Sequence, residues 1–112
     1  MAFLNCLSIL KDNRGWDLEA RRKDNEILLL EVKGHVGSTV QFELTPNEYE
    51  QLKRNADKYR VCVVFEALKN PDLYVFEVKY DENGLYLYSN KKNRIVRFVE
   101  KVAAKGVEIK MR

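Results

Sequence analysis

ILLLEVK, residues 27–33, is an apolar run rich in β-forming residues that ends in a charged pair. A short run of this kind predicts a buried β-strand. Because side chains alternate across a strand, Glu31 and Lys33 project to one face and Val32 to the other. An isolated buried charge is costly, so a buried strand with this ending must pair its charges or use them.

A second strand-like segment, WDLEAR at residues 16–21, precedes this run. The polar link at 23–26 allows the two strands to form a hairpin, which brings Asp17 close to Glu31. Two carboxylates beside the Lys33 ammonium form a candidate site for Mg²⁺ or Mn²⁺ that can also hold a phosphate. The alternative is a solvated Glu–Lys pair on an edge strand, and the spacing alone leaves both readings open.

Two stretches carry a resemblance to a known family: GWDLEARR at 15–22, and LLLEVKGHVGSTVQFELTPNEYEQLKRNADKYRVCVVFEAL at 28–68. They resemble the C-terminal domain of the plant protein NO VEIN and its microbial relatives. That family in turn resembles the PD-(D/E)xK restriction-endonuclease-like superfamily. The resemblance covers about half of the chain and implies a mixed β-sheet flanked by helices.

The same resemblance assigns roles to individual residues. It implies that Asp17 and Glu31 are metal ligands and that Lys33 orients the attacking water or stabilises the pentavalent phosphate. Gln41 matches a polar position at such sites and is expected to position substrate or water. One departure stands out, because nucleases of the superfamily often carry a further acid on a helix before the Asp strand, whereas residues 2–10 contain none.

Three function hypotheses follow. The first is a metal-dependent nuclease that binds nucleic acid, with DNA preferred, and hydrolyses phosphodiester bonds. The second is a catalytically weak or inactive nucleic-acid- or protein-binding module of the same fold within a defence or repair system. The third is a small interaction domain that binds no nucleic acid. A homodimer would suit the first, because cutting both strands of a duplex usually needs two sites.

The composition is that of one ordinary globular domain spanning residues 1–112. No run of eighteen apolar residues appears, so no membrane span is expected. Cys6 and Cys62 both lie among apolar residues, which is typical of small core side chains in a reducing compartment such as the cytoplasm.

The charge is unevenly distributed along the chain. Residues 91–112 carry eight Lys or Arg against two Glu, a balance of +6, whereas residues 1–90 carry twelve bases and fifteen acids, a balance of −3. We expect a helix over 94–105 that ends at Gly106 as a left-handed C-cap. Basic residues crowd the N-terminal end of that helix, where a bound phosphate would relieve their repulsion by the macrodipole. The predicted nucleic-acid contacts are Lys91, Lys92, Arg94 and Arg97.

The remaining elements complete an α-β-β-β-α-β-β-β-α-β order, which predicts an α/β or α+β domain. A helix start is clearest at Thr45, where Thr-Pro-Asn-Glu is typical of a capping box with Pro at the first position. Further helices are expected over 2–11 and 45–58, and further strands over 39–44, 60–67, 73–79, 85–88 and 107–111.

The histidine, the tryptophan and four of the tyrosines can each be interpreted as functional or as structural residues. His35 could act as a general base, although metal-bound water is the commoner device at such a site. Trp16 should face away from Asp17 and join the core. The tyrosines could stack bases, but they more often fill a sheet as good β-formers; they lie at 74, 80, 86 and 88.

Overall fold

The computed structural model describes residues 3–9, 14–35, 37, 39–65, 70–100 and 104–110. Within these ranges lie nine strands, one α-helix and one short 3-10 helix. In chain order the elements are β1 (Phe3–Ile9), β2 (Leu18–Arg22), β3 (Ile27–His35), β4 (Gln41–Leu44), α1 (Pro46–Arg54), β5 (Tyr59–Phe65), β6 (Asp72–Asp81), β7 (Gly84–Ser89), η1 (Lys91–Asn93), β8 (Arg94–Glu100) and β9 (Ala104–Ile109).

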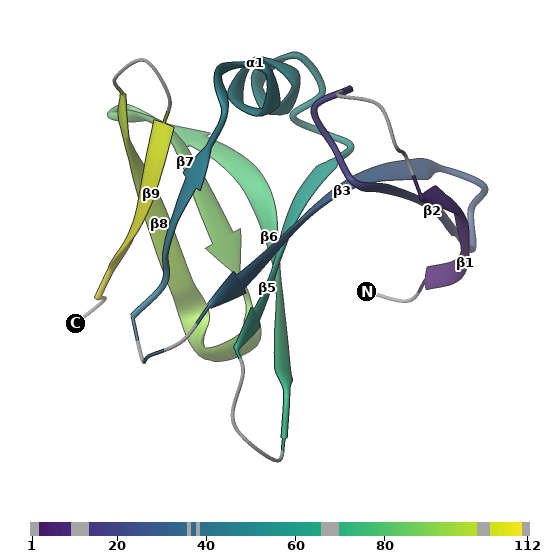
Figure 1. Cartoon of the computed structure of the whole chain (residues 1–112). Coiled ribbons are helices and arrows are strands. Elements are labelled where there is room, and N and C mark those ends of the chain that lie inside the picture. The colour runs from purple at the N-terminus through teal and green to yellow at the C-terminus, as the bar shows by residue number, and fades with distance from the viewer. Residues whose placement is uncertain are drawn as a thin grey trace.

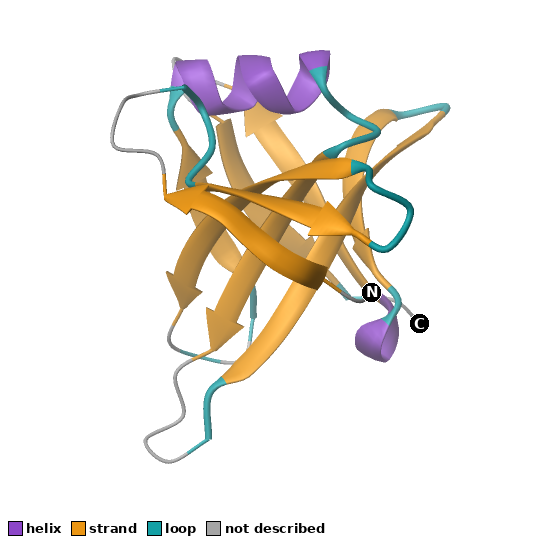
Figure 2. Cartoon of the chain, turned by 90° about the vertical axis from the view of Figure 1, so that its right-hand side faces the viewer, coloured by secondary structure: helices purple, strands orange, loops and turns teal. Residues whose placement is uncertain are grey.

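The strands form one mixed sheet in the order β1-β2-β3-β5-β6-β7-β8-β9-β4. Only β3 and β5 pair in parallel among these described strands. The sheet curls into a half-barrel, with α1 lying across one end of it (Figures 1 and 2). The expected mixed sheet is therefore confirmed. The expected flanking helices are wrong for the described residues, because α1 is their only α-helix.

The predicted hairpin between the first two motif strands is confirmed. Strand β2 pairs antiparallel with β3, with Leu18 opposite Leu30 and Arg21 opposite Ile27. The turn between them uses Asn25 at a φ of 67°, a left-handed conformation that asparagine tolerates better than most residues. This register carries Asp17, which precedes β2, to the charged end of β3.

The sheet buries apolar side chains on both faces. The larger cluster fills the inside of the half-barrel and includes Leu29, Val61, Val63 and Phe76, with Trp16 packed against it as predicted. A smaller cluster on the opposite face contains Leu28, Leu30 and Cys62, so Cys62 is the small core residue that its neighbours predicted. The side chain of Cys6 lies outside the described residues.

Helix α1 begins as its sequence predicts. The Thr45 hydroxyl accepts a hydrogen bond from the Glu48 amide at 3.1 Å, and Glu48 Oε1 accepts one from the Thr45 amide at 2.9 Å. This reciprocal pair satisfies two amides that the first turn leaves without helical partners. The helix ends at Arg54, short of the expected residue 58, because Asn55 leaves the helical conformation and caps the last turn.

Two predicted helices are wrong. Residues 3–9 form strand β1 rather than part of a helix over 2–11, and the expected helix over 94–105 is replaced by strand β8 and the start of β9, with 101–103 outside the described residues. In β8 the β-branched and aromatic residues Ile95, Val96, Phe98 and Val99 favour a strand more than a helix. The spacing of apolar residues in a short run fits both a helix and a strand. Pairing with strands distant in the sequence makes both segments, 3–9 and 94–100, strands.

The predicted strands over 39–44, 60–67, 73–79 and 85–88 are confirmed as β4, β5, β6 and β7, with shifted ends. Residues 66–67 lie outside the described part of the chain. The sequence predicts that the strand over 107–111 is the last one and lies at the edge of the sheet. Instead β9 (Ala104–Ile109) lies inside it, between β8 and β4.

Gly106 does not cap a helix but lies in β9 opposite Phe42 and Phe98. A Cβ atom placed there would lie 2.8 Å from Phe42 Cζ and 3.0 Å from Val96 Cγ1. The glycine therefore lets the aromatic ring of Phe42 and the aliphatic side chain of Val96 pack directly against the backbone of β9.

We predict that Gly106→Ala lowers the free energy of unfolding by about 1–3 kcal/mol, because the added methyl group overpacks this part of the core. Denaturant unfolding measures the change. Gly34→Ala is the matched control: Gly34 also lies in a strand, but a Cβ there meets nothing within 4 Å. Equal stability of the two variants would contradict the close packing at Gly106.

Candidate functional site

The charged end of β3 lies on the inner face of the sheet. Glu31 is opposite Val61 and Lys33 is opposite Val63, and both valines belong to the larger core cluster. Glu31 is only 2 % exposed, whereas Val32 between them is 39 % exposed on the other face. The alternation expected from the sequence is therefore confirmed.

Lys33 lies between two glutamates. Its Nζ is 3.1 Å from Glu31 Oε2 and 3.2 Å from Glu48 Oε1. Glu48 comes from the first turn of α1, and the same oxygen accepts the Thr45 amide of the capping box. The ammonium thus ties β3 to the start of α1 and pairs with the buried Glu31.

One oxygen of Glu31 is left over. Glu31 Oε1 is buried and has no hydrogen-bond partner among the described residues. A buried carboxylate oxygen without a partner is unfavourable and is either protonated or open to a ligand. The site therefore holds either a proton on Glu31 or one acceptor oxygen that no described residue uses.

Asp17 is held at the same end of β3. Its amide donates to the Leu30 carbonyl at 2.8 Å, and its Oδ2 accepts the Val32 amide at 2.8 Å. These two bonds straddle Glu31, so the Asp17 carboxylate is fixed beside that residue. The hairpin thus brings Asp17 to the Glu31 end of β3, where its charge adds to the raised pKa of Glu31, and a shared metal site for the two carboxylates stays a prediction.

A close-packed turn places Asp17. Gly15 has a φ of 96°, and a Cβ there would lie 2.5 Å from Gln51 Cγ of α1. The buried Tyr59 hydroxyl donates to the Gly15 carbonyl at 2.5 Å. Helix α1 and strand β5 therefore hold the turn that delivers Asp17, and only glycine suits this backbone position.

The charges within the site shift one another. Burial raises the pKa of Glu31 to about 7; Lys33 opposes this shift, and the carboxylates of Glu48 and Asp17 add to it. Burial alone would raise the pKa of Glu48, but the hydrogen bond from the Thr45 amide, the charge and hydrogen bond of Lys33, and a hydrogen bond with the Glu31 carboxyl together outweigh it and lower that pKa. Burial followed by the nearby carboxylates raises the pKa of Tyr59, which keeps its hydroxyl a donor.

A model of the family described as "Protein NO VEIN, C-terminal" matches residues 7–78. The chain belongs to this family. A search of curated proteins and a search of solved structures each found no match. The family match includes Asp17, Glu31, Lys33 and Glu48, so the whole charged cluster lies within the NO VEIN C-terminal region.

Gln41 also lies within the NO VEIN C-terminal match, at the exposed start of β4 opposite Val107. Among the contacts of the described residues, none joins its side chain to Glu31 or Lys33. Its role in positioning substrate or water stays a prediction. Sequence reasoning missed Glu48 and Tyr59, although the capping box had already placed Glu48 on the first turn of α1.

The predicted basic contacts lie beyond the NO VEIN C-terminal match and are not gathered at a helix end. Lys91 pairs with Asp72, Arg94 with Glu108 at 3.4 Å, and Arg97 with Asp81. Lys92 is exposed in the η1 turn. The helix-dipole argument for these four residues is therefore wrong, and a role in binding nucleic acid stays a prediction.

His35 continues the inner face of β3 two residues beyond Lys33. Its ring meets the Phe65 ring edge-on, with centroids 5.3 Å apart, and its Nε2 is buried with no hydrogen-bond partner among the described residues. This apolar packing favours the structural reading of His35. No helix in the described part of the chain is long and apolar enough to cross a membrane.

The raised pKa of Glu31 predicts a pH-dependent stability. An acid whose pKa rises on folding stabilises the fold below its unfolded value of 4.5, and that contribution is lost as the pH rises through about 7. Relative to Glu31→Gln, the unchanged protein should lose up to about 3 kcal/mol of unfolding free energy from about pH 4 to about pH 8.

Denaturant unfolding at a series of pH values measures this difference. Glu50→Gln, which makes the same substitution at an exposed position of α1, controls for the loss of a carboxylate. A difference between Glu31→Gln and the unchanged protein that does not vary with pH would contradict the assignment.

Proposed function

We propose that this chain is a metal-dependent nuclease-like domain that binds nucleic acid, preferentially DNA, and hydrolyses phosphodiester bonds at the Asp17–Glu31–Lys33 cluster. The observation that carries the proposal is the buried Oε1 of Glu31, which has no hydrogen-bond partner in the described part of the chain and lies at the same strand end as a fixed aspartate and a lysine. Such an arrangement leaves one acceptor for a cation and one ammonium for a phosphate.

The donor set suits Mg²⁺ in a particular way. In the described ranges no group of three or more His, Cys, Asp or Glu could hold a metal ion. Asp17 and Glu31 supply two hard oxygen donors, and Mg²⁺ is often bound by one or two carboxylates together with water and substrate phosphate oxygens. The fit is therefore to a substrate-assisted Mg²⁺ or Mn²⁺ site, not to a fully protein-ligated one.

Each residue then has a distinct task. Asp17 and Glu31 would hold the ion, which when bound polarises the phosphate and activates a water molecule. Lys33 would donate a hydrogen bond to the phosphate as negative charge develops on it. Glu48 and Glu31 keep Lys33 charged, since burial lowers its pKa but both carboxylates together raise it further. Gln41 would contact substrate from the start of β4.

A resemblance in sequence is the further reason for this proposal. The spacing of Asp17, Glu31 and Lys33 resembles that of the PD-(D/E)xK superfamily, an assignment that the match to the NO VEIN C-terminal family does not itself test. In that superfamily the aspartate, the glutamate and the lysine act together on a phosphodiester. A homodimer that presents two such sites would account for cleavage of both strands of a duplex.

A second candidate is a binding module of the same fold that does not cleave, within a defence or repair system. The specific observation in its favour is that Lys33 is already paired with both Glu31 and Glu48. An ammonium held by two carboxylates has to leave at least one of them before it reaches a phosphate. Affinity for DNA that falls steeply with salt, without cleavage, would select this candidate.

Cleavage of plasmid and single-stranded DNA in the presence of Mg²⁺ or Mn²⁺ tests the proposal. We expect Asp17→Asn and Lys33→Ala each to lower the rate by at least about 100-fold, because each removes a group that acts on the reacting phosphate. Lys53→Ala, a lysine exposed on α1, is the matched control and should retain the activity. Activity that persists in both site variants would identify a contaminating nuclease and overturn the assignment.

Metal binding has a readout that is independent of cleavage. Mg²⁺ that binds the folded protein alone should raise the melting temperature with increasing concentration. We expect this rise in the unchanged protein and its loss in Asp17→Asn, as measured by thermal unfolding. An equal rise in both proteins would place the ion elsewhere on the molecule.

A further inference from the structure

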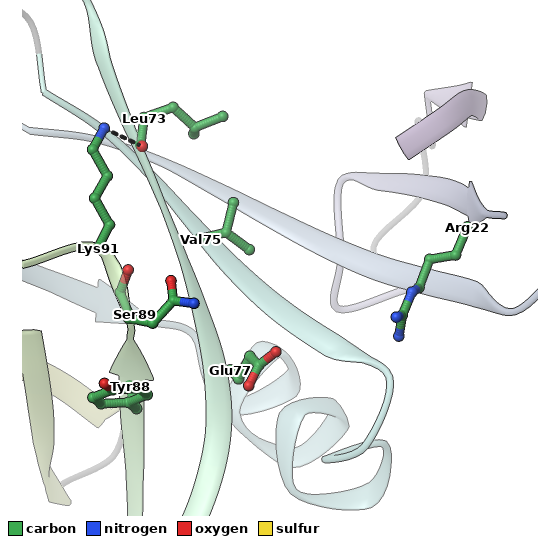
Figure 3. Close-up of a pocket in the computed structure, with 8 residues that line it drawn as sticks. Arg22, Leu73, Val75, Glu77, Tyr88, Ser89 and Lys91 are labelled. Atoms are coloured by element: carbon green, nitrogen blue, oxygen red, sulfur yellow. Dashed lines mark hydrogen bonds between the residues drawn. The ribbon is translucent and has the colours of Figure 1, made fainter. Parts of the chain in front are cut away.

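A pocket lies on the outer face of the sheet, away from the charged cluster. Its cavity volume is about 440 Å³, and its walls come from β2, β6, β7 and the first residue of η1. Figure 3 shows Arg22 on one side of it, Leu73, Val75 and Glu77 along β6, and Tyr88 and Lys91 on the other side. This volume is within the range of small-molecule sites, about 300–1,000 Å³.

The pocket and the candidate nuclease site occupy opposite faces. Val75 is opposite Cys62 and packs against the smaller core cluster, whereas Glu31 is opposite Val61 of the larger cluster. Since paired residues share a face and successive residues alternate, a ligand in the pocket would not touch Glu31. The pocket therefore needs its own explanation.

The wall along β6 is apolar and open to solvent. Leu73 is 49 % exposed, which is high for a leucine in a strand, and Val75 is partly exposed beside it. The Tyr88 hydroxyl donates to Asn93 Oδ1 at 2.6 Å, which fixes the ring at the side of the pocket. Together these side chains offer a surface for a flat, apolar group.

Cations stand at both sides of this apolar wall. Among the described residues, the Arg22 side chain has one loose ion pair, at 3.7 Å, with Glu26. On the opposite side Lys91 donates to the Leu73 carbonyl at 3.1 Å and pairs with Asp72, as the dashed line in Figure 3 marks for the first contact. Of the two described cations that line the pocket, Arg22 therefore has more donors without a described partner, and a planar guanidinium matches the oxygens of a phosphate.

Glu77 gives the pocket an acceptor. Its nearest cations are distant, with Lys79 Nζ at 3.7 Å and Arg60 Nη2 at 4.0 Å. Arg60 is itself buried, and its Nη1 donates to the carbonyls of Asp57 at 3.1 Å and Tyr59 at 3.0 Å. The Glu77 carboxylate, whose ion pairs are this long, keeps acceptor capacity for a ligand with hydroxyl or amino donors.

We propose that this outer pocket binds a nucleoside monophosphate. Such a ligand combines the three properties that the walls select. A flat base would lie against Leu73, Val75 and Tyr88, and the phosphate would pair with Arg22. Ribose hydroxyls or an amino group of the base would donate to Glu77. A ligand that carries only an anionic group would be repelled by the Glu77 carboxylate, because it has no hydrogen-bond donor for it.

Isothermal titration calorimetry with AMP, GMP, CMP and UMP tests the proposal, with adenosine and inorganic phosphate as partial ligands. We expect at least one nucleotide to bind more tightly than either partial ligand. Arg22→Ala should weaken that binding by about tenfold or more, the loss of one charge-assisted phosphate contact. Arg54→Ala is the matched control, because Arg54 also pairs with a glutamate four residues away, and should bind as the unchanged protein does.

A second variant guards against a folding defect in Arg22→Ala. Leu73→Asp places a negative charge on an exposed wall of the pocket and should also weaken binding. Asp17→Asn should leave it unchanged, so that failure of the nuclease assignment does not affect this test. No nucleotide binding at millimolar concentration, equal binding of phosphate and nucleotide, or full binding by Arg22→Ala and Leu73→Asp would each overturn the proposal.

Discussion

The ion pairs of Lys33 are the constraint on which the site depends. Strand β3 carries Glu31 into the inner face, next to Val61 and Phe76, where a lone carboxylate would be strongly disfavoured. Lys33 offsets this cost from the same strand, and Glu48 completes the pair from α1. The start of the helix, the end of β3 and the buried acid are thus coupled through one ammonium group. Moving the start of α1, the end of β3 or the Glu31 side chain would break an ion pair of Lys33 and leave a charge without its partner.

The same coupling explains why the aspartate turn is so closely packed. Gly15 fits against Gln51 of the helix, and Tyr59 of β5 donates to its carbonyl. The helix therefore positions both acids that flank Glu31: Glu48 directly and Asp17 through the turn. In chemical terms, α1 acts less as a cover for the sheet than as the element that aligns the carboxylates of the site.

Local signals predicted some parts of the structure well. The TPNE capping box located the start of α1, and the polar link at 23–26 predicted the hairpin that carries Asp17 to Glu31. The strands β1 and β8 were missed because their apolar spacing also fits a helix, and the decision came from partners distant in sequence. Lys33 was expected beside the two acids, and it pairs with Glu31, but its second partner Glu48 could not be inferred. That contact depends on how α1 crosses the end of the sheet, which no local pattern encodes.

The placement of β4 has a consequence for how the chain reaches this structure. Strand β4 follows β3 directly, yet it pairs only with β9 among the described strands, with Gln41 opposite Val107. The hydrogen bonds of β4 therefore form only when β9, far along the chain, is in place. Pairings that join such distant residues raise the relative contact order and slow folding. They also couple β4 to β9. The family region, which ends at residue 78, lacks the strand that β4 pairs with, so cleavage of the chain near β9 should loosen β4 as well.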